Sequence, residues 1–270
     1  MANVKRGGLP GSDLEAARMP GHWLLARLGK RVLRPGGMEL TRWMLNALRI
    51  GPEDHVVELA AGLGATAPLV LARRPAEYVG VDRESTVVAA LSALARDQAT
   101  EVHWREADAA RTGLPEASAS VVYGEAMLTM QPDPAKRRIV KEAYRLLAPS
   151  GRYGIHELCL VPDDIDPAIV NEVRTTLSET IHVGARPLTV RDWHDLLTEA
   201  GFTVTSETTT PLLVLELRRL IADEGITRTL RILAQMARDA PARRRVLRIR
   251  DVFRRYRPHL AAISIIATRP

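Results

Sequence analysis

The sequence has few cysteines and few aromatic residues, and each shortage excludes a class of site. The only cysteine among the 270 residues is Cys159, so an internal disulfide and a cysteine-built zinc site are both excluded. A single thiol fits a reducing cytoplasm. Aromatic residues make up 4% of the chain, which gives no sign of a stacking platform for single-stranded nucleic acid.

The sequence also lacks long apolar runs and clustered metal ligands. No stretch has the length of a membrane span, and the first residues do not resemble a signal peptide. His, Asp and Glu do not cluster at ligand spacing, so we expect no metal. Hydrophobic residues (46%) and charged residues (26%) are in the range of globular proteins. The heavy use of arginine over lysine is typical of GC-rich bacteria.

Positive charge is concentrated late in the chain, where the net charge of +6 has its main source. The segment from Arg243 to Arg257 carries arginines on one side of an expected helix and apolar residues on the other. We favour a helix that packs by its apolar side. Attraction of an anionic or membrane-dissolved substrate is a second interpretation, and nucleic-acid binding is disfavoured.

The stretch from His55 to Ala67 organises the chain. A short apolar run, typical of a buried parallel strand, leads into Gly62-Leu63-Gly64, and a helix is expected from about 65 to 73. Glycines without Cβ atoms allow a sharp turn and a close approach of a ligand to the backbone. A strand, a glycine turn and a helix start together predict a cradle for a nucleotide-like ligand.

Strands and helices then alternate, which predicts an α/β fold with a Rossmann-like, doubly wound, mostly parallel sheet. The further strands are expected at 77–82, 101–108, 118–125, 152–158, 202–210 and 259–268. The helices are expected at 22–34, 38–48, 85–96, 134–147, 168–182, 190–200, 217–222, 226–237 and 242–256. We expect residues 1–50 to form an N-terminal helical lid. Residues 51–270 would form the main domain, with cap insertions at about 160–190 and 212–258.

Four acidic residues lie where expected strands end: Glu58, Asp82, Asp108 and Glu125. Ligands of such sheets bind at the carboxyl ends of the strands, so four acids at equivalent places indicate a binding site. A carboxylate at the end of the second strand can accept both hydroxyls of a ribose, which suggests this role for Asp82.

Five segments in order resemble the motifs of class I S-adenosylmethionine-dependent methyltransferases. They are Glu58-Leu-Ala-Ala-Gly-Leu-Gly64, Gly80-Val-Asp82, Ala107-Asp108-Ala109, Val121-Val-Tyr-Gly-Glu125 and Leu146-Leu-Ala-Pro-Ser-Gly-Arg152. The subgroup that the chain resembles contains small-molecule enzymes similar to menaquinone, ubiquinone and sterol methyltransferases. The resemblance implies S-adenosyl-L-methionine as cofactor and a seven-stranded sheet. Its last strand would run antiparallel between the fifth and sixth.

The resemblance also implies which residues bind the cofactor. Gly62 and Gly64 would approach its methionine part, with Glu58 near the amino group, and Asp82 would hold the ribose. The remaining positions are Ala60 in the turn, Arg83, Asp108 and Ala109 at the adenine, and Glu125 and Ala126 beside the reacting methyl. Ala60 and Ser150 stand where the family commonly has glycine.

Methyl transfer from a sulfonium is an in-line displacement that depends above all on alignment. A base is needed only when the acceptor keeps its proton at neutral pH. The catalytic candidates are Glu125, His156 and Glu157, and His22 and His182 could contribute from the cap. Because side chains alternate on a strand, His156 and Glu157 face opposite sides. We expect Glu157 to line the pocket, whereas a buried strand histidine is commonly a core residue.

The sequence thus predicts a bacterial, cytoplasmic methyltransferase that acts on a small, partly apolar molecule, without nucleic acid and without a membrane span. A homo-oligomer is compatible with this. Two alternatives stay open. Gly62-Leu-Gly64-Ala-Thr-Ala67 fits the permissive glycine pattern of NAD(P)-dependent oxidoreductases, although Glu58 and the Asp108-Ala109 pair speak against it. The fold could also serve as a non-catalytic module that binds S-adenosylmethionine.

Overall fold

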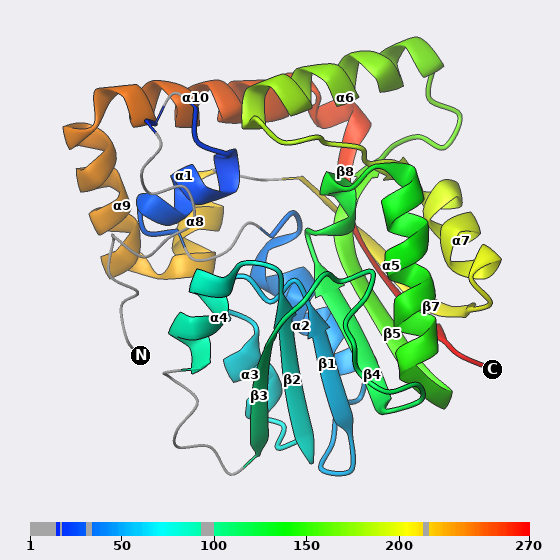
Figure 1. Cartoon of the computed structure of the whole chain (residues 1–270). Helices are drawn as coiled ribbons and strands as arrows, with labels where there is room; N and C mark the ends of the chain where they lie inside the picture. Colours follow the sequence, from blue (N-terminus) through cyan, green and yellow to red (C-terminus); the bar gives the residue numbers. More distant parts are fainter. Residues whose placement is uncertain (1–14, 17, 31–33, 93–99, 213–215) are drawn as a thin grey trace.

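The computed structural model describes residues 15–16, 18–30, 34–92, 100–212 and 216–270. One sheet runs through this part of the chain, and helices cover both of its faces (Figure 1). The strands are β1 (His55–Leu59), β2 (Glu77–Asp82), β3 (Glu101–Glu106), β4 (Ala119–Glu125), β5 (Leu147–Leu160), β6 (Leu188–Thr189), β7 (Thr203–Pro211) and β8 (Leu260–Thr268). The α/β class expected from the alternation is confirmed.

The helices follow the strands in alternation up to β5 and then form an extended group. They are α1 (Gly21–Arg27), α2 (Gly37–Ala47), α3 (Ala67–Leu71), α4 (Ser85–Ser92), α5 (Asp133–Leu146), α6 (Pro167–Ile181), α7 (Val190–Glu199), α8 (Leu217–Glu224), α9 (Ile226–Arg238) and α10 (Ala240–Arg255). Two short 3-10 helices, η2 (Leu128–Met130) and η3 (Arg257–His259), precede α5 and β8.

The strand order is β3-β2-β1-β4-β5-β8-β7, with β1 to β5 parallel to one another. β8 runs antiparallel between β5 and β7, which confirms the expected reversed last strand. β6 is an addition to the expected seven strands, since it pairs with Cys159 and Leu160 at the end of β5. The order reverses between β1 and β4, and such a switch point opens a crevice for ligands at the carboxyl ends.

Each face of the sheet is closed by its own helices. On one face, α5 and α7 bury apolar side chains such as Ile139 and Trp193 against β1, β2, β4, β5 and β8. On the other face, α2 and α3 pack Met44, Leu48 and Val70 against the strands. The helix expected from 38 to 48 therefore covers the sheet, whereas α1 lies in the cap.

A helical cap of α1, α6, α8, α9 and α10 lies above the ends of the parallel strands, at the top of Figure 1. α10 buries Val246, Ile249 and Phe253, and α6 is among the helices packed beside it. The arginine-rich segment is thus a cap helix that packs by its apolar side, which was the favoured interpretation.

Several expected elements differ in length from those observed. The helix expected at 22–34 ends at Arg27 because Gly29 adopts a φ of +98°, and residues 31–33 lie outside the described part. α3 is shorter than 65–73 because the turn extends to Thr66. α4 is described as far as Ser92, and the rest of the expected 85–96 helix lies outside the described residues. β5 is longer than expected because it pairs with β8 up to Leu160.

Candidate active site

The turn after β1 is built from residues in the left-handed region of backbone conformation. Ala60, Gly62 and Gly64 have φ angles of +56°, +54° and +65°. Glycine adopts such angles without strain, whereas the Cβ of alanine makes them costly. The turn is attached to the end of β2, because the Gly62 amide donates a hydrogen bond to Asp82 Oδ2 at 2.8 Å. This hydrogen bond holds the glycine turn against the carboxyl end of β2.

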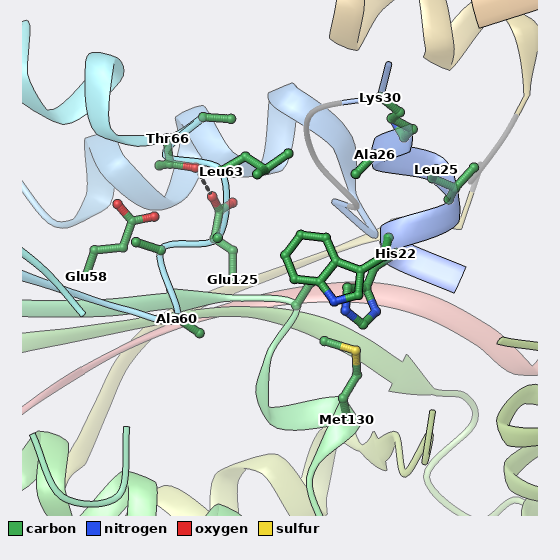
Figure 2. Close-up of a pocket in the computed structure, with 15 residues that line it drawn as sticks. His22, Leu25, Ala26, Lys30, Glu58, Ala60, Leu63, Thr66, Glu125 and Met130 are labelled. Atoms are coloured by element: carbon green, nitrogen blue, oxygen red, sulfur yellow. Dashed lines mark hydrogen bonds between the residues drawn. The ribbon is translucent and has the colours of Figure 1, made fainter. Parts of the chain in front are cut away.

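Two adjoining cavities lie at the carboxyl ends of the parallel strands, and α1 borders both. The first is lined by His22, Trp23, Leu25, Ala26, Lys30, Glu58, Ala60, Ala61, Gly62, Leu63, Ala65, Thr66, Glu125, Ala126 and Met130 (Figure 2). The second shares His22, Trp23, Ala60, Gly62, Glu125, Ala126 and Met130 with it. It extends along Asp82, Arg83, Glu84, Ala107, Asp108, Ala109, Met127, Gln131 and Ile139. The shared residues make the two cavities one continuous site.

The four strand-end acids all line this site. Glu58 lies in the first cavity, Asp82 and Asp108 lie in the second, and Glu125 borders both. Gly64 lines neither cavity. A Cβ on Gly64 would lie 2.6 Å from Leu91 Cδ2, so this glycine allows the turn to pack against α4.

Glu125 is the centre of a buried hydrogen-bond network. Its carboxylate accepts from the Thr41 hydroxyl of α2 and from the Thr66 hydroxyl at the start of α3. Arg34 donates to Thr66 Oγ1 at 2.8 Å and places its Nε 3.6 Å from Glu125 Oε2. Burial alone would raise the pKa of Glu125, but the hydrogen bond from His156 and the charge of Arg34 lower it to about 2. Glu125 is therefore ionised at neutral pH.

His156 is fully buried, and both of its ring nitrogens have partners. Nε2 accepts a hydrogen bond from the Gly36 amide at 2.9 Å. Nδ1 lies 2.9 Å from Glu125 Oε1. A nitrogen that accepts from an amide carries no proton, so the proton of a neutral ring resides on Nδ1 and is donated to Glu125. His156 lines neither cavity, and this position suits a positioning residue rather than a base.

Glu157 points to the opposite side and holds the loop after β4. Its oxygens accept from the backbone amides of Met127, Leu128 and Thr129 at 2.8 to 3.0 Å and from the Thr129 hydroxyl at 2.7 Å. Glu157 is fully buried and lines neither cavity, contrary to the expectation that it faces the pocket. Alternation along β5 gave the correct opposite sides but did not indicate which side held the cavity.

Glu58 is buried and contacts the hydroxyl of Tyr78, which donates to it. Burial raises the pKa of Glu58 to about 7, although hydrogen bonds from tyrosine hydroxyls oppose the rise. The site thus holds one carboxylate with a strongly lowered pKa and another that titrates near neutrality. Two such different environments separate the roles that the two acids can take.

The cap supplies the remaining side of the site. His22 and Trp23 of α1 line both cavities, and their rings lie 4.9 Å apart. Burial and the charge of Arg83 lower the pKa of His22 to about 4, so His22 is neutral at pH 7. His182 lies elsewhere, beside Arg244 and Arg248 at the end of α6. Of the two cap histidines expected near the site, His22 alone lines these two cavities.

Sequence reasoning missed the residues that surround Glu125. Thr66 stands inside the glycine-turn stretch and could have been noted as a hydroxyl near the ligand. Arg34, Gly36 and Thr41 precede the turn and carry no local signal, because their role depends on how α2 packs against the sheet. Tyr78 has the pattern of an ordinary strand residue in the sequence, and only the structure shows that its hydroxyl donates to Glu58.

Comparison with known proteins relates the part of the chain that builds this site to a known domain. Residues 56–151 match the model of the methyltransferase domain family. A protein of Haemophilus influenzae is 32% identical over 215 residues, which cover 79% of this chain and 84% of that protein, and it is itself described as uncharacterised. Residues 56–151 thus carry a methyltransferase domain. That domain implies S-adenosyl-L-methionine as the cofactor.

Solved structures share the fold of this chain at low sequence identity. The [4+2]-cyclase SpnF is 16% identical, with a TM-score of 0.70 over 93% of this chain and 94% of that one. Geranyl diphosphate C-methyltransferase from Streptomyces coelicolor, solved with Mg²⁺, geranyl diphosphate and S-adenosyl-L-homocysteine, is 15% identical. Its TM-score is 0.60, over 86% of this chain and 79% of that one. At such identities the likeness establishes the fold only.

Within the described ranges, no helix is both long enough and apolar enough to cross a bilayer. The same residues contain no group of three or more His, Cys, Asp or Glu side chains placed to hold a metal ion.

Proposed function

We propose that the protein transfers a methyl group from S-adenosyl-L-methionine to a small, partly apolar molecule by in-line displacement. The observation that carries the proposal is the gathering of Glu58, Asp82, Asp108 and Glu125 around one continuous site. S-adenosylmethionine carries a cationic sulfonium and a cationic amino group, and a rim of carboxylates suits such a ligand. We also propose that the protein belongs with the small-molecule methyltransferases that are similar to the menaquinone, ubiquinone and sterol enzymes.

The second cavity suits the adenosine part of the cofactor. Asp82 accepts from the amides of Gly62 and Glu84 at 2.8 and 3.0 Å, which fixes the direction of its carboxylate. Each oxygen keeps a further lone pair, so both ribose hydroxyls can donate to Asp82. Asp108, Ala109 and Arg83 would border the adenine. A Cβ on Gly62 would meet nothing closer than the Ala60 carbonyl oxygen at 3.9 Å, which leaves the turn open toward a ligand.

The first cavity suits the methionine part and the acceptor. Glu58 would face the amino group, with Glu125 and Ala126 beside the reacting methyl. The methyl donor supplies the activation, as positive charge on sulfur. The chain's own contribution is to fix the reacting groups, and orientation of this kind can supply roughly 7–11 kcal/mol of a barrier. Trp23, Leu25, Ala26, Leu63 and Met130 give the acceptor a mostly apolar surrounding.

The pKa values separate the roles of the catalytic candidates. Glu125, with a pKa of about 2, is too weak a base for a neutral acceptor and would act as a fixed negative charge. His156 would position Glu125, and Glu157 would hold the loop after β4. Glu58 titrates near the working pH, with a pKa of about 7, but its place at the cofactor's amino group suits charge pairing rather than removal of a proton from the acceptor.

Calorimetric titration of the protein with S-adenosylmethionine and with NAD tests this proposal. We expect S-adenosylmethionine to bind more tightly, and tighter binding of NAD would refute the reading. The Asp82→Ala variant should bind S-adenosylmethionine more than tenfold more weakly, because it loses the ribose acceptor. An unchanged affinity in that variant would contradict the ribose role.

A module that binds the cofactor without transferring its methyl group is the second candidate. It gains support from the [4+2]-cyclase SpnF, which shares the fold and is named for an activity other than methyl transfer. Incubation with labelled methyl donor and a bacterial extract separates the two functions. Transfer of label to a small molecule supports the enzyme, and tight binding without any labelled product supports the module.

A further inference from the structure

The exposed large hydrophobic side chains of the described residues are confined to one corner of the cap. They lie on α8 and α9, at the left of Figure 1, and are Leu217, Ile221, Ile226, Leu230 and Leu233. Ile226 is 67% exposed and Leu230 is 60% exposed. Scattered single residues of this kind are normal on a protein surface, but five on two consecutive helices mark an interaction site. We call these five residues the α8–α9 apolar face.

Spacing along each helix places these side chains together. Leu217 and Ile221 are four residues apart on α8, and Ile226, Leu230 and Leu233 are spaced by four and three on α9. Residues at such spacings lie on the same side of a helix. A neighbouring side of α9 is used for folding, since Thr229 and Ile232 are buried. The exposed side is therefore a surplus apolar surface and not part of the core.

The charges that α8 and α9 themselves turn outward have one sign. The carboxylates on the two flanks, Glu216 and Asp239, are paired with Arg254 and Arg27. Between Leu217 and Arg238 the only carboxylates in the sequence are Asp223 and Glu224. Both are turned inward, with side-chain exposures of 5% and 2%, and lie 3.7 and 3.9 Å from Lys30 Nζ. Arg231 and Arg238 on α9 are exposed. A helix with an apolar side flanked by arginines is the pattern of a segment that lies in an anionic membrane interface.

We infer that the α8–α9 apolar face docks on an anionic lipid bilayer, with Leu217, Ile221, Ile226, Leu230 and Leu233 in the interface and Arg231 and Arg238 at the headgroups. A second copy of the chain fits less well. An interface between two copies would bring the arginines of both together, and the outer side of these helices carries no carboxylate to pair with them. The inference goes beyond the proposed methyl transfer and does not depend on it.

Docking here would bring the bilayer close to the site. The inner side of α8 is joined to the cavity wall, because Asp223 accepts from the Met38 amide at 2.9 Å and lies beside Lys30. Lys30 lines the first cavity. α8 thus separates the α8–α9 apolar face from the first cavity, and a molecule dissolved in the bilayer would have a short way to travel.

A labelled cysteine on the full chain tests the docking. Cys159 is fully buried, so a thiol-reactive, environment-sensitive dye would label an introduced surface cysteine selectively. Leu230→Cys places the dye on the face, and Ser206→Cys places it on exposed β7, at the other side of the molecule (Figure 1). We expect vesicles of phosphatidylglycerol and phosphatidylcholine to shift the emission of the first label but not of the second. No shift, or an equal shift of both labels, would overturn the inference.

Matched charge variants in a vesicle sedimentation assay separate this face from general basicity. Arg231→Gln with Arg238→Gln should weaken binding to the mixed vesicles about tenfold. Arg243→Gln with Arg248→Gln removes the same charge from α10 and should change binding much less. Equal weakening by both pairs would overturn the inference. So would a dimer in sedimentation equilibrium that Leu230→Ser dissociates, since a second copy would then occupy the face.

Discussion

Nδ1 of His156 lies 2.9 Å from Oε1 of Glu125, and the two residues are register partners on the adjacent strands β5 and β4. The Gly36 amide fixes the other nitrogen of the ring. The backbone before α2 is thereby connected through a histidine to the carboxylate that borders both cavities.

Glu125 should distinguish the cofactor from its demethylated product. The product keeps the amino group but has a neutral sulfur, so a fixed negative charge beside the sulfur favours the sulfonium form. Glu125→Gln should weaken binding of S-adenosylmethionine about tenfold or more and change binding of S-adenosylhomocysteine little. Glu58→Gln is the control, because it should weaken both ligands alike. Calorimetric titration of both variants with both ligands measures these affinities. An equal loss of affinity for the two ligands in Glu125→Gln contradicts the assignment.

Glu58 should make cofactor binding depend on pH near neutrality. Its pKa is raised from 4.5 to about 7 in the folded protein, so the stability that it contributes is fully present below pH 4.5 and lost as pH rises through 7. A cationic ligand favours the ionised form, so affinity should rise between pH 6 and pH 8. Calorimetry and thermal unfolding across this range measure both effects. Glu58→Gln should flatten both curves, and a curve that keeps its slope in this variant points to another group.

Ala60 and Ser150 should each be improved by glycine. Their φ angles of +56° and +64° strain any residue with a Cβ, so Ala60→Gly and Ser150→Gly should each raise the free energy of unfolding by about 1 kcal/mol. Ala60 lines both cavities, whereas Ser150 lines neither. Only Ala60→Gly should therefore alter cofactor affinity. Chemical denaturation combined with calorimetry checks this, and a loss of stability in both variants would disprove the strain.

Gly62 and Gly64 should respond differently to the same substitution. Both have positive φ, so alanine costs roughly 1 kcal/mol of strain at either position. Gly64→Ala adds a clash with Leu91, at 2.6 Å, and should lower stability further. Gly62→Ala meets open space and should lower cofactor affinity more than stability. Unfolding and binding measured on both variants would separate the two, and identical profiles would contradict the division of roles.

The sequence predicted those parts of the site that follow one another along the chain. Glu58, Asp82, Asp108 and Glu125 could be placed together because parallel strands end at the same edge of a sheet. The order of the strands around β8 came with the family resemblance. Residues that contact the site from elsewhere in the sequence could not be placed in this way, because Arg34 and Thr41 reach Glu125 only through the packing of α2.

The sequence also could not show which of the two sides of a strand or helix faces the cavity or the solvent. Alternation put His156 and Glu157 on opposite sides of β5, yet the side with the cavity depends on which helices cover each face of the sheet. The apolar side of α9 has the pattern of an ordinary packed helix, and only the arrangement of the cap leaves it uncovered. The end of α1 depended on one glycine, Gly29, whose conformation outweighed an otherwise continuous helical pattern.

The placement of β8 between β5 and β7 determines when the sheet can be completed during synthesis. β5 leaves the ribosome about a hundred residues before the strand that must fill the gap beside it. Until then, β5 and β7 each present an open edge that can pair with a strand of another chain. A nascent chain of this protein therefore cannot complete its sheet before β8 has been made, and the edges of β5 and β7 stay unpaired up to that point.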